Sequence, residues 1–202
     1  MENRGRSQKG DTMKTQYRTM GIDDAPFKFR DRNVAVVGAV VRGNSYLEGV
    51  LKTKIRVDGR NATKKVSAMI KNSRFREQIK CVMIDGIALG GFNVVDIEKL
   101  HNDTGIPVIT ITRNKPDYDK MKNALKKHFK DWERRWRIIT KNKVFRVKTK
   151  HKPVYVGLAG ITLDRAEIII KQTTMRGALP EPVRIAHLIA TGIKTGESYG
   201  KA

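Results

Sequence analysis

The stretch from Cys81 to Ile97 constrains the fold of this chain more than any other part of the sequence. A short apolar run, residues 81–84, is followed at once by Asp85-Gly86. An apolar run that ends at a glycine turn is typical of a buried β-strand. Asp85 is therefore expected where this strand leaves the core. In open α/β sheets, ligands bind beyond the carboxyl ends of the strands, so a carboxylate there is a candidate for binding a metal ion or a substrate.

A second segment, Met20-Gly21-Ile22-Asp23-Asp24, has the same pattern of apolar residues followed by carboxylates. We expect the two strands to be neighbours in the sheet, with the carboxyl groups of Asp23 and Asp85 on the order of 4 to 6 Å apart, within reach of one cation. The alternative is that each Asp only caps a turn, which is the commoner role of an isolated Asp at a strand end.

The order of predicted elements indicates an α/β fold. Apolar runs predict strands over 17–23, 34–41, 46–57, 80–85, 107–111, 144–147 and 154–158. Helical spacing predicts helices over 62–72, 92–100, 116–137, 163–172 and 182–192, the first of them capped by Asn61. The first three strands form an antiparallel meander, and the following strand-helix-strand order implies a right-handed parallel crossover. The sequence thus predicts a mixed sheet flanked by helices.

The length of 202 residues suits one domain, expected over residues 15–202. Residues 1–14 are polar and basic with almost nothing to bury, so they are expected to be disordered. The single cysteine, Cys81, excludes an internal disulfide, and the four histidines lack the paired spacing of a structural zinc site.

The net charge of +22 indicates a polyanionic partner, with nucleic acid as the first candidate. A membrane is a poorer candidate, because no stretch approaches the roughly 20 apolar residues of a membrane span. A cytoplasmic location and a monomeric state are expected. On the basic helix 116–137 and the turn 148–152, Lys126, Lys130 and Lys152 are candidates for phosphate contacts. The alternative is that these charges only solvate the surface.

No phosphate-binding loop and no Ser or Cys nucleophile motif is present in the sequence. The remaining candidates for chemistry are carboxylates at strand ends, above all Asp23, Asp58 and Asp85. Oxygen ligands of this kind suit Mg²⁺ or Mn²⁺, which activate water and stabilise a leaving oxygen in phosphodiester hydrolysis.

Several segments resemble an archaeal family related to endonuclease V, sometimes described as endonuclease-dU-like, with a ribonuclease-H-like fold. They include Met20-Gly21-Ile22-Asp23-Asp24, Asp85-Gly86 with residues 91–97, Lys152-Pro153-Val154-Tyr155-Val156, and Leu179-Pro180-Glu181-Pro182-Val183-Arg184-Ile185-Ala186-His187. The resemblance covers residues 17–200.

The resemblance implies roles for individual residues. Asp23 and Asp85 match the metal-binding Asp residues of endonuclease V, and Arg113 falls where the relatives carry a phosphate-contacting Lys. Asp58 is the best stand-in for the relatives' metal-binding Glu. Their Gly-His pair has no counterpart at residues 158–160.

The sequence therefore predicts a ribonuclease-H-like nucleic-acid endonuclease that uses Mg²⁺ or Mn²⁺, acting on DNA or RNA. Two alternatives stay open: a nucleic-acid-binding protein that kept the fold without the chemistry, and a basic RNA-associated structural protein. Loss of metal-dependent cleavage in an Asp23→Asn variant would separate the first hypothesis from both others.

Overall fold

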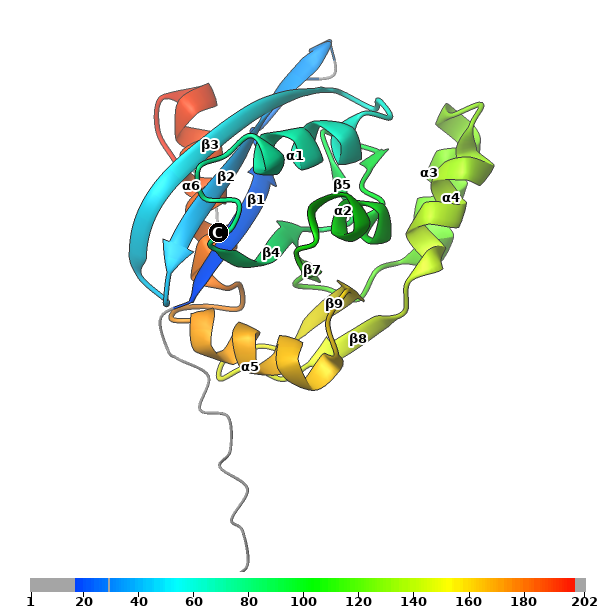
Figure 1. Ribbon diagram of the computed structural model, residues 1–202. Coiled ribbons are helices and arrows are strands. Elements are labelled where there is room, and N and C mark those ends of the chain that lie inside the picture. The colour runs from blue at the N-terminus through cyan, green and yellow to red at the C-terminus, as the bar shows by residue number, and fades with distance from the viewer. Residues whose placement is uncertain (1–16, 29, 199–202) are drawn as a thin grey trace, which may run out of the picture.

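A seven-stranded mixed sheet forms the centre of the molecule (Figure 1). The computed structural model describes residues 17–28 and 30–198, so the expected basic segment 1–14 lies outside the described residues. The strand order is β3-β2-β1-β4-β7-β9-β8, with a separate two-stranded ribbon of β5 and β6. The strands are β1 (Arg18–Asp24), β2 (Asn33–Arg42), β3 (Tyr46–Arg56), β4 (Ile79–Asp85), β5 (Ala88–Leu89), β6 (Asn93–Val94), β7 (Val108–Thr112), β8 (Val144–Val147) and β9 (Val154–Ala159).

The strand directions bring several loops to one end of the sheet. β1, β4 and β7 run parallel to one another. β3 shares this direction because it is antiparallel to β2, which is antiparallel to β1. β8 shares it too, because β8 is antiparallel to β9, and β9 is antiparallel to β7. We call the end where these five strands finish the carboxyl end of the sheet. This topology confirms the predicted meander followed by parallel strand-helix-strand units.

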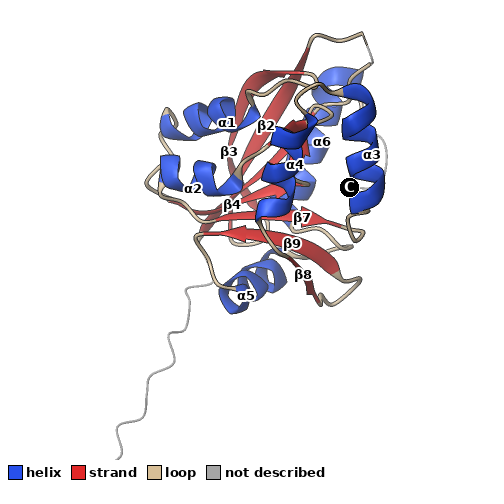
Figure 2. Cartoon of the chain, turned by 90° about the vertical axis from the view of Figure 1, so that its right-hand side faces the viewer, coloured by secondary structure: helices blue, strands red, loops and turns tan. Residues whose placement is uncertain are grey.

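Helices cover both faces of the sheet (Figure 2). They are α1 (Ala62–Lys71), α2 (Ile97–Thr104), α3 (Tyr118–His128), α4 (Trp132–Lys141), α5 (Leu163–Thr173) and α6 (Glu181–Thr195). On one face, buried residues of α1 and α2 pack with β1, β2 and β4 in the largest core cluster. On the other face, α5 and the start of α6 pack on β4, β7 and β9. None of the helices in the described residues combines the length and apolar character needed to cross a membrane.

The predicted single helix over 116–137 is wrong: the segment forms two helices, α3 and α4, that pack beside each other. The helical conformation is interrupted at Phe129, whose backbone is extended, with φ −130° and ψ 122°. Phe129 and Trp132 continue the three-to-four-residue apolar spacing across the break, and both join the cluster around Leu125 and Ile139. No Gly or Pro marks the break, so the spacing alone indicated one helix. The predicted helix over 92–100 is corrected in the same way, because residues 93–94 form β6 and α2 starts only at Ile97.

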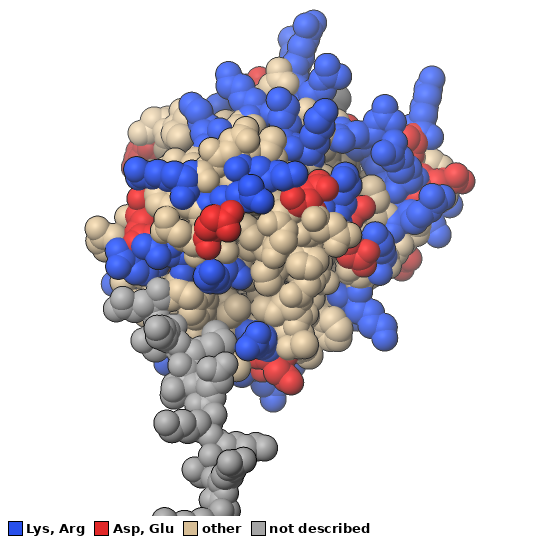
Figure 3. Space-filling model, in the orientation of Figure 1, with Lys and Arg blue, Asp and Glu red and all other residues tan. Residues whose placement is uncertain are grey.

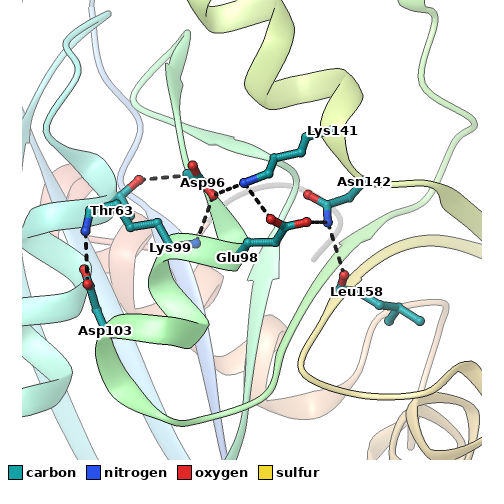
Figure 4. A network of polar contacts seen from close by, with 8 residues as sticks. All are labelled: Thr63, Asp96, Glu98, Lys99, Asp103, Lys141, Asn142 and Leu158. Carbon is teal, nitrogen blue, oxygen red and sulfur yellow. Dashed lines mark hydrogen bonds and ion pairs between the residues drawn. The ribbon is translucent and has the colours of Figure 1, made fainter.

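A polar network joins α2 to its neighbours (Figure 4). Asp96 caps α2 by accepting a hydrogen bond from the Lys99 backbone N–H, and its own N–H donates to Thr63 Oγ1 of α1 at 3.0 Å. Lys141, in the last turn of α4, pairs with Glu98 at 2.5 Å and lies 3.9 Å from Asp96. These contacts fix α4 and α1 against the same short helix.

Candidate metal centre

Asp23 and Asp85 lie side by side at the carboxyl end of the sheet. β1 and β4 are adjacent and parallel, and Ile22 is in register with Ile84, so the residue that follows each of them is brought level. Side chains alternate between the two faces of a strand. Met20 and Ile22 of β1, and Ile84 of β4, belong to the core under α1. Asp23 and Asp85 therefore face the opposite side, toward α6.

α6 adds a third side chain, His187, to this pair. The Nδ1 atom of His187 lies 2.7 Å from Oδ2 of Asp23. One potential ligand atom from each of Asp23, Asp85 and His187 lies within 4.8 Å of the other two. Opposite ligands of a divalent cation with bonds of about 2.0 to 2.2 Å lie about 4.0 to 4.4 Å apart, so small side-chain shifts would let one ion contact all three atoms. Two carboxylate oxygens and one imidazole nitrogen fit Mn²⁺ and, less well, Mg²⁺, because Mg²⁺ prefers oxygen ligands.

Gly21 makes the approach of α6 possible. A Cβ atom at Gly21 would lie 2.0 Å from the carbonyl carbon of Pro182, in the first turn of α6. Gly21 stands two residues before Asp23, on the same face of β1, so the helix start rests directly on the strand. His187 follows Pro182 by little more than one helical turn and thereby reaches Asp23.

A Gly21→Ala substitution is expected to separate β1 from α6, because the clash is with backbone that cannot move aside. Overpacking of this kind costs about 1 to 3 kcal/mol. The free energy of unfolding should fall accordingly in urea titrations. The control is Gly192→Ala within α6, where a Cβ meets nothing nearer than Ser198 Oγ at 3.5 Å. The control should be as stable as the wild type or gain up to about 1 kcal/mol from helix propensity. Equal stability of the Gly21→Ala variant and the wild type would contradict this packing.

Burial and like charge disfavour the ionised forms of these acids and raise their pKa values. Burial, followed by the charges of Asp85 and Asp24, raises the pKa of Asp23 to about 8. Burial also raises the pKa of Asp24 to about 6, against an opposing hydrogen bond from the Gly90 backbone. The pKa of Asp85 is raised by burial as well, while the nearby Arg113 and His187 act in the opposite direction. A cation bound between the carboxylates would relieve this repulsion.

Asp58, predicted as the third metal ligand, lies outside this three-residue group. Its Oδ1 accepts a hydrogen bond from the Phe92 backbone N–H at 2.8 Å, and its own N–H donates to the Gly90 carbonyl at the same distance. Its backbone adopts a left-handed φ of 53°, which Asp tolerates better than most residues. Asp58 thus fastens the turn after β3 to the glycine turn after β5. The third side chain of the group is His187.

The other predicted binding residues have different surroundings. Arg113 is exposed just after β7, close enough to act on the pKa of both Asp23 and Asp85. Lys152 is exposed in the β8–β9 turn, at the carboxyl end of the sheet, because Tyr155 pairs with Thr112. Lys126 and Lys130 lie at the far end of α3 and just beyond it, where the Lys126 ammonium stands 5.0 Å from the centre of the Trp132 ring.

A cavity of about 320 Å³ opens beyond β4, beginning at Gly86. Its walls come from β7, β9 and the start of α3, and they include the aromatic rings of Phe92, Tyr118 and Tyr155. The cavity therefore places a largely apolar space next to the residue that follows Asp85.

The chain matches one protein family over most of its length. Residues 15–194 match the family model described as Endonuclease dU. A UPF0215 protein of Methanothermobacter thermautotrophicus is 46% identical over 192 residues, which are 94% of this chain and 94% of the relative. A UPF0215 protein of Methanosarcina mazei is 48% identical over 193 residues, 94% of this chain and 97% of the relative.

Solved structures identify the fold. The crystal structure of a protein of unknown function from Archaeoglobus fulgidus has a TM-score of 0.80 and 42% identity, covering 88% of this chain and 98% of that one. Ciona intestinalis endonuclease V, in complex with DNA containing an inosine, has a TM-score of 0.56 and 14% identity, covering 85% of this chain and 82% of that one. At 14% identity the likeness shows the fold alone, and that fold is ribonuclease-H-like.

Proposed function

The chain belongs to the endonuclease dU family, and we propose that it is a metal-dependent endonuclease that hydrolyses phosphodiester bonds in nucleic acid. The observation that carries the proposal is the convergence of Asp23, Asp85 and His187 within 4.8 Å at the carboxyl end of the sheet. The raised pKa values of both Asp residues support it, because buried acids whose ionised forms are disfavoured are typical of functional sites.

The side chains would divide the work of hydrolysis among them. Asp23, Asp85 and His187 would hold the ion, and His187 would be oriented by its contact with Asp23. A divalent ion at this point would supply charge stabilisation at the attacking and leaving oxygens of the phosphate. Arg113, exposed and close to the acids, would contact a phosphate oxygen and hold the substrate backbone in place.

The cavity beyond Gly86 supports recognition of a single base. Enzymes that act at one nucleotide commonly draw its base out of the stack and hold it between apolar and aromatic side chains. The cavity of about 320 Å³, with three aromatic rings among its lining residues, matches that requirement in size and character. The family description and the inosine in the DNA bound by the Ciona enzyme make dU and inosine the first bases to test.

Cleavage of labelled oligonucleotides tests the proposal. DNA and RNA strands, single and duplex, with dU, inosine or no modification, are incubated with the protein and Mn²⁺, Mg²⁺ or a chelator. We expect cleavage of at least one modified substrate with Mn²⁺ and none with the chelator. Absence of cleavage on every substrate would refute the endonuclease and favour a nucleic-acid-binding protein with the same fold.

A further inference from the structure

A basic region lies just beyond β3, in an open hollow of about 660 Å³. The hollow is bounded by the end of β3, the start of α1 and α4. Five exposed cationic residues line it: Arg56, Arg60, Lys64, Lys65 and Arg134. Figure 3 shows Lys and Arg side chains gathered along the upper edge of this face of the molecule, over β3, α1 and the α3–α4 pair.

These cations are poorly neutralised. Among the described residues, Arg56, Lys64, Lys65 and Arg134 form no ion pair, and Arg60 has only a long contact of 3.8 Å with Asp131. The carboxylate of Asp58, also in the lining, already accepts the Phe92 N–H.

The neighbouring polar network shows the opposite pattern. There, Lys99 pairs with Asp103 at 3.0 Å, and Lys141 pairs with Glu98 (Figure 4). The cations beside α2 are thus paired with acids, whereas most of those in the hollow are not.

The backbone that carries the hollow is held firmly in place. Arg135, only 6% exposed, donates hydrogen bonds to the carbonyls of Asp58, Gly59 and Phe92. Asn93, fully buried, donates to the Arg56 carbonyl and accepts from the Ala62 N–H at the start of α1. The cations therefore project from a fixed frame, which lowers the entropy cost of binding a ligand.

The start of α1 adds to the positive field. Asn61, expected as the capping residue, makes no side-chain cap, and no acidic residue lies in the first turn. Lys64 and Lys65 occupy the positions where the helix dipole favours negative charge. A bound anion would interact favourably with both the helix dipole and the two lysines.

We propose that this hollow binds backbone phosphates of the nucleic acid at nucleotides outside the cleaved bond. The inference rests on the proposed function for the identity of the polyanion. β3 and β1 end at the same end of the sheet and are separated by β2 alone, so their ends lie on the order of 10 Å apart across the sheet. The hollow lies on the α1 face of the sheet and the acids face α6. A nucleic-acid strand that contacts both therefore passes over the carboxyl end of the sheet. That path covers at least about three nucleotides at 3.4 Å each.

Metal-free binding measurements test the proposal with matched charge changes. The Lys64→Gln/Lys65→Gln protein is compared with Lys71→Gln/Lys80→Gln, which removes the same charge from the far end of α1 and the start of β4, at the opposite end of the sheet. Fluorescence anisotropy with a labelled DNA duplex gives the affinity between about 50 and 200 mM NaCl. We expect the first pair to lower the slope of log K against log salt by about 1.8, since each lost duplex phosphate contact contributes about 0.9. The second pair should leave the slope at the wild-type value.

An independent variant and the cleavage result keep the outcomes distinct. Arg134→Gln, on the α4 wall, should lower the slope by about 0.9, whatever the effect of the lysine changes on α1. Equal slopes in all variants and the wild type would overturn the inference. A steep wild-type slope that falls with Lys64 and Lys65, in a protein that cuts no substrate, would refute the nuclease and retain the binding site.

Discussion

An Asp85→Asn variant is expected to lose metal-dependent cleavage by more than about 10²-fold, because removing even an outer partner of a metal ligand typically costs about 10- to 100-fold. The same change should make the metal-free protein more stable. Asp85 raises the pKa of Asp23 through its charge, and its own carboxylate is disfavoured by burial, so a neutral amide removes both penalties. One substitution that lowers activity and raises stability is expected where a buried carboxylate is retained to bind a metal ion.

Added Mn²⁺ should reverse the order of stability. A ligand that binds only the folded state at 100 times its Kd stabilises by about 2.7 kcal/mol. The wild type should gain this stabilisation, and Asp85→Asn should gain little. Thermal unfolding with and without Mn²⁺ measures both effects. Asp164→Asn, an exposed Asp in the first turn of α5, is the control and should behave like the wild type. An Asp85→Asn protein that stays fully active would remove Asp85 from the centre.

The metal-free protein is expected to become less stable as the pH rises from about 5 to about 8. The pKa of Asp23 rises from an ordinary 3.8 to about 8 in the folded protein, and that of Asp24 rises to about 6. In this window the folded state holds protons that the unfolded state has released. Each such proton lowers the free energy of unfolding by about 1.4 kcal/mol per pH unit, and the loss ends above the folded pKa.

Acids with a lowered pKa do not obscure this window. Hydrogen bonds and ion pairs lower the pKa of Asp31 and Glu48, so they contribute stability that is lost only in more acidic solution. Urea titrations between pH 5 and 8 on the wild type and Asp23→Asn isolate the effect, and the variant should show a much flatter dependence. With saturating Mn²⁺ the wild type should instead gain stability with pH, because the ion competes with protons for the same oxygens. Identical pH profiles for the variant and the wild type would contradict the assignment of the proton to Asp23.

The sequence predicts the positions of Asp23 and Asp85 because local patterns indicate that each lies at the end of a strand. Asp23 and Asp85 each end an apolar run, and the order of strands made β1 and β4 neighbours. The sheet register then brings the two residues level, as expected. Asp58 also ends a strand, but its left-handed backbone and its bond to the Phe92 N–H direct it to a turn. Nothing in the local sequence distinguishes an Asp that faces a neighbouring strand from one that closes a loop.

His187 could not be found by local pattern, because it meets Asp23 across 164 positions of sequence. Its place depends on how closely α6 approaches β1, which depends on the absence of a side chain at Gly21. The segment that ends in His187 was among those that resemble the archaeal family, and this was the one available signal. The break between α3 and α4 is not visible in the sequence either, because the aromatic spacing continues through Phe129 into Trp132.

Electron paramagnetic resonance of Mn²⁺ measures directly whether Asp23, Asp85 and His187 together bind the divalent ion proposed for cleavage. Titration of the protein with Mn²⁺ gives its affinity for the ion without any substrate. We expect His187→Ala to weaken binding by at least about 10-fold, since loss of a ligand should cost no less than loss of its outer partner. Asp58→Ala should bind with wild-type affinity, because its carboxylate holds a turn. Unchanged Mn²⁺ affinity in His187→Ala, or loss of binding in Asp58→Ala alone, would contradict the account.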